Sequence, residues 1–241
     1  MRKITVITVT YNDLDALSKT FLNLRSFKKQ FYEYIVIDGG STDGTLEYLK
    51  SNIDIVDKWV SEKDSGIYDA MNKGWSLANI DSHIIYLGAG DQLISLPSIK
   101  DGDSRNVIFG HVVRESIGVF KSKVDFRLIL VNTIHHQALL IPKSINPQPP
   151  FDTRYKIYAD FDFNQRLYKR NITFIYSEAT KGFATFGGVS QMLNIEEMAS
   201  VSLKNFGFLA MVASYLFLYY QKSKHNFKLR MKVIVLFFLK N

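Results

Sequence analysis

Apolar and polar positions alternate regularly through the first half of the chain. Four runs rich in β-branched and aliphatic residues, KITVITVTY, YIVIDGG, VDKWVSE and HIIYLGAGD, have the length and character of buried strands. Between the first two, apolar residues recur at helical spacing and place Leu17, Phe21 and Leu24 on one face. A helix start at STDGTLEYLKS and a helix over residues 67–78 follow. Strands that alternate with helices of this length predict βαβ units and a mostly parallel sheet.

The second half of the chain is less regular. NVIFGHVVRE and IGVFKS predict two antiparallel strands around a turn, and HHQALLIPKS predicts another strand. YADFDFNQRLYKR predicts a helix that begins with acids and ends with bases, as the helix dipole favours. ITFIYSEATKGFATFGGVS predicts a strand followed by a glycine-rich loop.

Polar residues and glycines follow each of the four predicted parallel strands. They are Tyr11-Asn12-Asp13, Asp38-Gly39-Gly40-Ser41, residues 62–66, and Gly90-Asp91. Because ligands of such sheets bind beyond the carboxyl ends of the strands, the four clusters should converge along one edge. Strand-to-helix turns favour these residue types for structural reasons alone, which explains any single cluster more easily than all four.

Composition excludes several classes of protein. Apolar residues make up 46% and charged residues 22% of the 241 positions, as in ordinary globular proteins. The chain has no cysteine, which excludes disulfides, thiolate metal sites and cysteine nucleophiles and agrees with a reducing compartment. The N-terminal apolar run is short and broken by threonines, so it predicts a first strand rather than a signal peptide.

The net charge of +7 is concentrated at the C-terminus. Residues 221–241 contain six Lys or Arg and no acid, which leaves the rest of the chain near +1. Residues 206–220 carry no charge but are shorter than the ~20 residues that span a bilayer. We therefore expect interfacial helices with their Lys and Arg at anionic headgroups. A helix packed on the rest of the protein or on another subunit is the alternative, and nucleic-acid binding is not expected.

The string VIDGGSTDGT, residues 36–45, is the most specific motif. Its glycines let the backbone approach a ligand, and Ser41 or Asp43 can cap the next helix, but the spacing is not that of a Walker loop or a GxGxxG fingerprint. Together with VITVTYN and SEKDSGIYDAMNKG, it resembles family 2 glycosyltransferases of the bacterial polysaccharide and O-antigen type, from the N-terminus to about residue 190. The resemblance implies an α/β fold of the GT-A (Rossmann-like) type, a mostly parallel sheet with flanking helices, over residues 1–200. An amphipathic helical tail would follow over residues 201–241.

The resemblance implies roles for several residues in binding the donor nucleotide. Thr10, Tyr11 and Asn12 would lie against the uracil and the ribose. Asp38 would accept a hydrogen bond from the uracil ring, and Asp43 would support that pocket. A carboxylate beside an imide N–H suits uracil and repels the unprotonated ring nitrogen of cytosine, so a UDP-sugar donor is favoured.

The motif GIYDAMNKG places Asp69, Asn72 and Lys73 on one helix face, three and four residues apart. In the functional interpretation, Asp69 and Asn72 point at the sugar or ribose of the donor and Lys73 lies near phosphate. The structural alternative is an exposed Asp69–Lys73 pair worth about 0.3 kcal/mol. Gly66 and Gly74 bracket this helix as they do in family members, which favours the functional interpretation.

The segment YLGAGDQL aligns with the metal motif of the family, which usually carries two acids. Here Asp91 is the single acid, with Gly90 before it and Ala89 where a second acid often stands. One acid can suffice, because magnesium commonly uses one or two carboxylates with substrate phosphates and water, and manganese accepts similar ligands. We therefore expect Asp91 to bind Mn²⁺ or Mg²⁺ with help from the diphosphate, and Gly90 to lie beside the nucleotide sugar. A polar turn after the strand is the alternative.

Sugar transfer also needs a base to take the proton of the acceptor hydroxyl. Asp160 and Asp162 stand two residues apart on a predicted helix, so they point to nearly opposite faces. Asp162 has Arg166 four residues on, in position for a surface ion pair, and is expected to be structural. Asp160 has no such local partner and is the expected general base, although Ala159 replaces the glutamate that precedes this position in the family.

The segment IHHQALLI contributes His135, His136 and Gln137. Successive strand residues face opposite ways, so the two imidazoles are not expected to chelate one ion. The resemblance favours His136 and Gln137 as a pair near the diphosphate or the acceptor, and a hydrogen-bonded core histidine is the alternative. FGGVS, residues 186–190, looks like the late glycine loop of the family near the donor phosphates, or is a plain loop.

The function expected from these residues is an inverting, metal-dependent transfer of a hexose from a UDP-sugar. The acceptor would be a lipid-linked (polyprenyl-diphosphate) glycan in the biosynthesis of a bacterial surface polysaccharide such as O-antigen, capsule or exopolysaccharide. The enzyme would be cytoplasmic and peripherally associated with the inner face of the cytoplasmic membrane. Inversion is expected because a single base and no second nucleophile are apparent. The alternative is a non-catalytic nucleotide-binding or tethering subunit of a polysaccharide-assembly complex, against which Asp91 and Asp160 argue.

Overall fold

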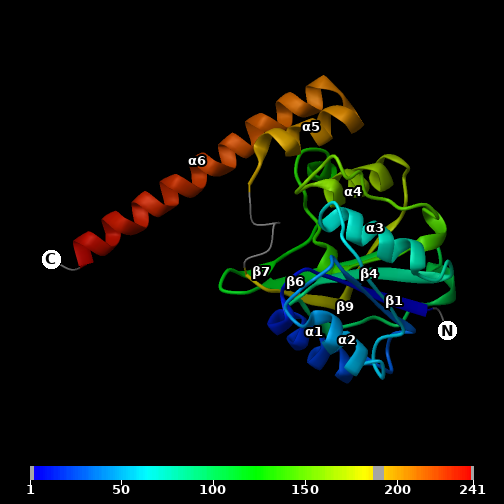
Figure 1. Cartoon of the computed structure of the whole chain (residues 1–241). Coiled ribbons are helices and arrows are strands. Elements are labelled where there is room, and N and C mark those ends of the chain that lie inside the picture. The colour runs from blue at the N-terminus through cyan, green and yellow to red at the C-terminus, as the bar shows by residue number, and fades with distance from the viewer. Residues whose placement is uncertain (1–2, 187–192, 240–241) are drawn as a thin grey trace.

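The computed structural model describes residues 3–186 and 193–239, with residue 3 and residues 224–239 described by their backbone alone. Within these ranges nine strands form one sheet, and helices cover it on both faces (Figure 1). The strands are β1 (Lys3–Thr10), β2 (Glu33–Asp38), β3 (Lys58–Ser61), β4 (Ser82–Gly88), β5 (Gln92–Ser95), β6 (Val107–Arg114), β7 (Gly118–Phe120), β8 (Leu139–Pro142) and β9 (Phe174–Ala184). The helices are α1 (Leu14–Phe27), α2 (Thr45–Ser51), α3 (Ile67–Leu77), α4 (Ala159–Lys169), α5 (Ile195–Phe206) and α6 (Phe208–Leu239).

The first half of the chain forms the parallel part of the sheet. The strand order is β3-β2-β1-β4-β8-β6-β9-β5, with β7 paired to β6. β1 pairs in parallel with both β2 and β4, and β2 pairs in parallel with β3. The four strands and the three helices predicted in this half are all present, and α1 begins where the carboxylate of Asp13 accepts the backbone N–H of Ala16 at 3.3 Å.

Alternate residues of the parallel strands point to opposite faces and build two core layers. Val6 and Val36 pack with the apolar face of α1 on one side of the sheet. Ile7 and Ile37 pack with α3 and α4 on the other, where an added Cβ at Gly74 would stand 2.5 Å from a methyl group of Ile7. Figure 1 shows α1 and α2 on one face and α3 and α4 on the other. Burial on both faces is why these strands are apolar throughout rather than alternating.

The second half of the chain extends the sheet with antiparallel strands. β8 pairs antiparallel with β4 and with β6, and the predicted β6–β7 hairpin is confirmed. β6 and β9 are parallel, whereas the short strand β5, which the sequence does not predict, pairs antiparallel with β9. The α/β fold is therefore as expected, with four of the eight strand pairings parallel.

The strand predicted at HHQALLIPKS begins later than expected. Residues His136–Ala138 form a 3₁₀ turn, closed by a hydrogen bond from the N–H of Ala138 to the carbonyl of His135, and β8 starts at Leu139. The expectation that His135 and His136 alternate across a strand is therefore wrong. The turn brings His136 and Gln137 to the end of β4 instead.

The C-terminal part consists of two helices. α5 runs through the predicted boundary at residue 200, and its Met198 and Val201 are buried in the core formed with α3 and α4. α6 continues for 32 residues and extends away from the sheet (Figure 1). In the part of the chain that the structure describes, no helix has both the length and the apolar content needed to cross a membrane.

Candidate active site

A cleft of about 780 Å³ opens beside the end of β4. Asp91, His136, Gln137 and Asp160, the residues predicted for the metal, the acceptor or diphosphate, and the base, all line it. They come from the β4–β5 turn, the 3₁₀ turn before β8 and the first turn of α4. The fold thus brings together four side chains that are up to 69 positions apart in the sequence.

Asp91 lies at the floor of the cleft and is only 6% exposed. Its carboxylate accepts the backbone N–H groups of Gly88 at 2.9 Å and Thr185 at 3.1 Å, and the side-chain N–H of Gln137 at 3.1 Å. Burial raises the pKa of Asp91 above its usual value, although His136 and these hydrogen bonds act in the opposite direction. The carboxylate is therefore desolvated, with no Lys or Arg of the described residues in an ion pair with it.

The turn that holds Asp91 depends on Gly90. Gly90 has φ +91°, and an added Cβ would stand 3.0 Å from the hydroxyl of Thr185. Its N–H donates to the hydroxyl of Thr20 at 2.9 Å, and its carbonyl accepts the Thr185 hydroxyl at 2.6 Å. These contacts give Gly90 a structural role, and its predicted role beside the nucleotide sugar stays a prediction.

The immediate surroundings of Asp91 fit a divalent cation. The side-chain oxygen Oε1 of Gln137 is buried and has no hydrogen-bond partner within residues 3–186 and 193–239. A desolvated carboxylate and an unpartnered amide oxygen are two hard ligands, as Mg²⁺ or Mn²⁺ prefers when phosphate and water complete the coordination. Over the same residues no three His, Cys, Asp or Glu side chains come together, so the protein alone would not enclose the ion.

His136 lines the cleft beside Asp160. Its Nδ1 is 3.7 Å from Oδ2 of Asp160, and the two side chains are 19% and 14% exposed. Burial lowers the pKa of His136, but the carboxylates of Asp160 and Asp91 outweigh burial, and the net shift is upward. His136 is thus partnered by Asp160, as the alternative of a hydrogen-bonded core histidine also expects, and its role near the diphosphate or the acceptor stays a prediction.

Asp160 is held by partners that the sequence did not indicate. Its Oδ1 accepts the backbone N–H of Phe161 at 2.7 Å and lies 3.3 Å from the hydroxyl of Tyr68. Its Oδ2 accepts the side-chain N–H of Asn132 at 3.2 Å. Tyr68 also donates to the carbonyl of Ile157 at 2.5 Å, and burial raises its pKa well above the usual value. Tyr68 stands inside GIYDAMNKG, but no sequence signal marked Asn132.

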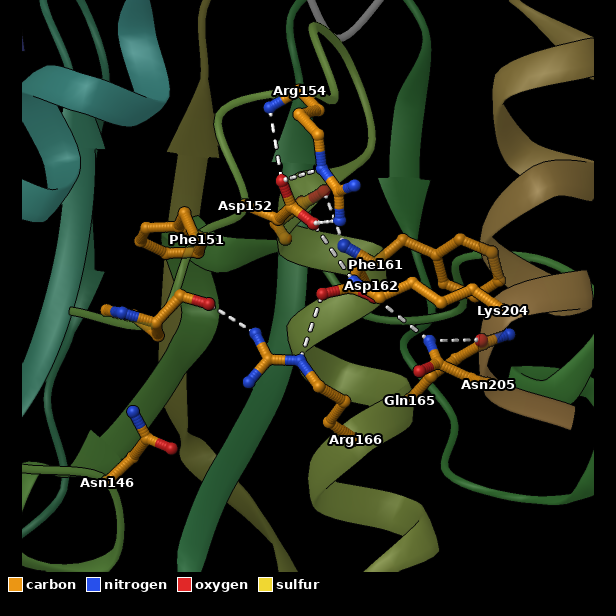
Figure 2. A network of polar contacts seen from close by, with 12 residues as sticks. Asn146, Phe151, Asp152, Arg154, Phe161, Asp162, Gln165, Arg166, Lys204 and Asn205 are labelled. Carbon is orange, nitrogen blue, oxygen red and sulfur yellow. Dashed lines mark hydrogen bonds and ion pairs between the residues drawn. The ribbon is translucent and has the colours of Figure 1, made fainter. Parts of the chain in front are cut away.

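Asp162 points away from the cleft, as expected from its position on the helix. Its carboxylate is fully buried and contacts Nε of Arg166 at 2.9 Å, Nζ of Lys204 at 2.9 Å and the side-chain N–H of Asn205 at 3.1 Å. Figure 2 shows this network between α4 and α5, continued by Lys204 to Asp152. The predicted pairing with Arg166 is present, but it is buried at Asp162 rather than a surface pair.

Asp38, predicted to contact uracil, is fully buried at the end of β2. Its carboxylate accepts the backbone N–H of Ser41 at 3.1 Å and the hydroxyl of Ser61 at 2.6 Å, and the Ser41 hydroxyl also contacts it. Thr10 lies beside Asp38 on the neighbouring strand, and its hydroxyl is buried without a hydrogen-bond partner in the described part of the chain. An unsatisfied hydroxyl next to a carboxylate is compatible with a ligand at this strand end.

The loop after β1 is tied to the loop after β2. The N–H of Asn12 donates to the hydroxyl of Ser41 at 2.7 Å, and its side-chain oxygen accepts the N–H of Thr42 at 2.8 Å. Asp43 accepts the N–H of Leu14 at 2.9 Å, and hydrogen bonding, first from Thr45, lowers its pKa. Tyr11, by contrast, is 64% exposed and free to face a ligand. Asn12 and Asp43 thus join the two loops, and their roles in binding the nucleotide stay predictions.

The predicted donor residues of α3 make structural contacts. Asn72 donates to the carbonyl of Phe151 at 2.8 Å and accepts its N–H at 2.9 Å, so both ends of its amide are satisfied within the protein. Lys73 contacts Glu62 at 2.8 Å and Asp69 at 3.8 Å, so the Asp69–Lys73 pair of the structural alternative is present, although the two side chains are only 30% and 23% exposed. These three residues do not line the cleft, and their donor-facing roles stay predictions. Residues 187–190 of the predicted glycine loop lie outside the described residues.

A family model described as "Glycosyl transferase family 2" matches residues 5–94. A "PGL/p-HBAD biosynthesis glycosyltransferase" of Mycobacterium bovis is 29% identical over 179 residues, which cover 67% of this chain and 69% of the relative. A "Dolichyl N-acetyl-alpha-D-glucosaminyl phosphate 3-beta-D-2,3-diacetamido-2,3-dideoxy-beta-D-glucuronosyltransferase" of Methanococcus voltae is 32% identical over 93 residues, 36% of this chain and 29% of that protein.

Solved structures share the fold. S. aureus TarS 1–349 in complex with UDP aligns with a TM-score of 0.59 at 18% identity, over 85% of this chain and 66% of that one. This chain covers 38% of a longer TarS chain. The mannosyltransferase PcManGT from Pyrobaculum calidifontis, in complex with GDP-Man and Mn²⁺, aligns with a TM-score of 0.61 at 13% identity, over 89% of this chain and 70% of that one. Residues 5–94 therefore belong to the family 2 glycosyltransferases, the similarity to the mycobacterial glycosyltransferase extends over two thirds of the chain, and the solved structures show that the chain shares their fold.

Proposed function

We propose that this glycosyltransferase moves a hexose from a UDP-sugar to a lipid-linked acceptor, with inversion at the anomeric carbon. The observation that carries the proposal is that Asp91, Asp160 and His136 line one cleft, with His136 3.7 Å from Asp160. The carboxylate of Asp91 is suited to the diphosphate end of a donor, and the carboxylate of Asp160 is suited to the acceptor hydroxyl. The Asp38–Thr10 pair at the ends of β2 and β1 supports uracil as the base.

The proposed reaction is one displacement. Asp160 takes the proton of the acceptor hydroxyl, whose oxygen forms a bond to the anomeric carbon. The bond from that carbon to the diphosphate oxygen breaks, and its electron pair leaves with UDP. Tyr68 and Asn132 hold the two oxygens of Asp160 in place, and His136 lies 3.7 Å from one of them. When bound at Asp91 and Gln137, Mn²⁺ or Mg²⁺ would supply positive charge for the leaving diphosphate.

Nucleotide binding tests the donor. Calorimetric titration with UDP, CDP and GDP in excess MgCl₂ should give the lowest Kd for UDP, with CDP at least about tenfold weaker because its ring nitrogen lacks the imide proton that a carboxylate accepts. Asp38→Asn should remove most of that difference, provided that its Tm matches the wild type. GDP or CDP binding as tight as UDP would contradict the proposal.

We further propose a lipid-linked acceptor in bacterial surface polysaccharide assembly, and a location at the inner face of the cytoplasmic membrane. Support comes from α6, whose exposed apolar side chains include Leu209, Leu216 and Tyr219, and from the basic residues that follow in the sequence. The name of the Methanococcus relative also describes an acceptor linked to dolichyl phosphate. Sedimentation with vesicles tests this: the protein should bind anionic phosphatidylglycerol vesicles. Lys222→Glu with Lys228→Glu should weaken binding, and equal binding to neutral vesicles would contradict the electrostatic part.

A further inference from the structure

Arg114 is a cation that lines the cleft and has no role in the proposed reaction. It is the last residue of β6, where its backbone is fixed between Gly118 of β7 and Ala184 of β9. Thr185 directly follows Ala184, and its backbone N–H donates to the carboxylate of Asp91 at 3.1 Å. The side chain of Arg114 lines the same cleft as Asp91 and Asp160.

The guanidinium of Arg114 has an aromatic support but no acidic partner. Its central carbon lies 5.3 Å from the ring centroid of Phe120, whose ring meets His135 edge-on at 4.2 Å between centroids. Within residues 3–186 and 193–239 its Nε is buried without a hydrogen-bond partner, and no carboxylate forms an ion pair with it. The neighbouring Glu115 accepts the N–H of Phe186 at 2.9 Å instead. The remaining residues of the chain, 1–2, 187–192 and 240–241, contain no Asp or Glu side chain.

A buried guanidinium donor without a partner is unfavourable unless a ligand satisfies it. Its planar fork matches the oxygens of phosphate and carboxylate groups, with which it forms paired, charge-assisted hydrogen bonds. Stacking on Phe120 holds the fork in one orientation and leaves its edge available. The ligand chemistry that fits is therefore an oxyanion.

The order of the strands indicates which substrate carries that oxyanion. The predicted uracil residues follow β2 and β1, and Asp91 follows β4, so a nucleotide diphosphate would run from β2 towards β4. Arg114 ends β6, two strands beyond β4 in the order β4-β8-β6. This position is on the far side of Asp91 from the predicted uracil residues, in the cleft that Asp160 also lines.

We propose that Arg114 is an acceptor-recognition residue that binds an oxyanion of the acceptor, a phosphate oxygen of its lipid-linked diphosphate. The assignment rests on the proposed function for the distinction between donor and acceptor sides. The assignment adds to the proposed function the requirement that the acceptor carries a negative charge, because a neutral acceptor would leave Arg114 without a partner. Arg114 is thus a determinant of acceptor affinity and not of donor affinity.

Calorimetric titration of the full chain tests the assignment, with geranyl diphosphate as the acceptor-side probe and UDP as the donor-side probe, each in excess MgCl₂. The geranyl diphosphate titration is done with UDP present at saturation. Arg114→Gln should raise the Kd of geranyl diphosphate about tenfold or more, Arg114→Lys should raise it less, and both should leave the Kd of UDP within about twofold. Arg105→Gln, at the exposed opposite end of β6, is the matched control and should change neither Kd.

For a wild type that binds UDP, each other outcome overturns the assignment. A rise in the Kd of UDP without a rise for geranyl diphosphate would place Arg114 on the donor side. Unchanged values, or a wild-type protein that does not bind geranyl diphosphate, would reduce Arg114 to packing on Phe120. Failure of the wild type to bind UDP would instead count against the proposed function, and the Arg114 comparison would then be made without nucleotide. Arg114→Lys keeps the charge, so it remains informative if Arg114→Gln loses its fold.

Discussion

The two faces of α4 carry one aspartate each, two residues apart, in opposite environments. Asp160 faces the cleft, is 14% exposed and is held by Tyr68 and Asn132, with His136 3.7 Å away. Asp162 faces α5, is fully buried and contacts Arg166 and Lys204 at 2.9 Å each. The same helix thus carries Asp160, whose carboxylate is accessible from the cleft, and Asp162, whose carboxylate is fully buried in ion pairs. The comparison teaches that partner and access, not residue type, decide which acid can act as a base.

The largest expected effect comes from the cleft face. Asp160→Asn keeps the shape of the side chain but removes the proton acceptor, so transfer should fall by about 10²–10⁴-fold. UDP release per folded molecule measures this loss. The Tm and the Kd of UDP should stay close to wild type, since Asp160 carries no part of the α4–α5 network. A variant that turns over normally would show that the general base has been misassigned.

The opposite face should give the opposite result. Asp162→Asn leaves Lys204 and Arg166 facing a neutral amide, and breaking a buried pair in this way should lower the free energy of unfolding by about 3 kcal/mol. That is the low end for buried pairs, because Arg166 and Lys204 are 31% and 36% exposed. In thermal unfolding, Tm should fall by about 10 °C. Activity measured well below that Tm should match the wild type, and a loss as large as that of Asp160→Asn would erase the distinction between the faces.

Across the cleft from Asp160, the raised pKa of Asp91 predicts a pH-dependent affinity for metal. The folded state holds the proton of Asp91 more tightly than the unfolded chain, and a cation must displace that proton. The Kd of Mn²⁺, followed by electron paramagnetic resonance, should therefore fall as pH rises through the pKa of Asp91 and then level off. Asp91→Asn should abolish this dependence, and Gln137→Met should weaken binding at every pH. Binding that does not change with pH in the wild type would contradict the assignment of Asp91.

The smallest effect is expected at the exposed edge of the network. The pKa of Asp152 is lowered, first by Arg154 and then with help from Lys204, so its folded pKa lies below its unfolded value. Its contribution to stability is therefore present above about pH 4 and is lost as pH falls further. Asp152→Asn should destabilise by less than about 1 kcal/mol at neutral pH, since Arg154 is 81% exposed. Chemical denaturation across pH should show a shallower acid limb in the variant; a limb as steep as that of the wild type would locate the acid sensitivity elsewhere.

The regular half of the chain was predictable because its signals are local. Strands buried on both faces and helices with one apolar face produced β1 to β4 and α1 to α3 in the expected order. The opposite orientation of Asp160 and Asp162 followed from helical geometry, and Arg166 followed from its spacing of four.

What the sequence did not reveal depends on contacts between distant segments. Lys204 and Asn205 reach Asp162 from α5, more than 40 residues away, and Asn72 is satisfied by Phe151, 79 residues away. The strand β5 is four residues long and forms only because β9 offers an edge. The sequence does not reveal the 3₁₀ turn at His136, because the apolar residues that follow it have the pattern of a strand. Only the hydrogen bond from the N–H of Ala138 to the carbonyl of His135 shows the turn. Local pattern therefore predicted which residues line the cleft better than it predicted which contacts hold them.

The most direct test of the account is release of UDP from a panel of UDP-sugars, with Mn²⁺ or Mg²⁺ and a detergent-solubilised bacterial lipid extract as acceptor, and with Asp160→Asn as the blank. The account predicts metal-dependent release from one donor by the wild type and almost none by the variant. Equal release by both proteins, or none from any donor by a wild-type protein that binds UDP, would contradict it.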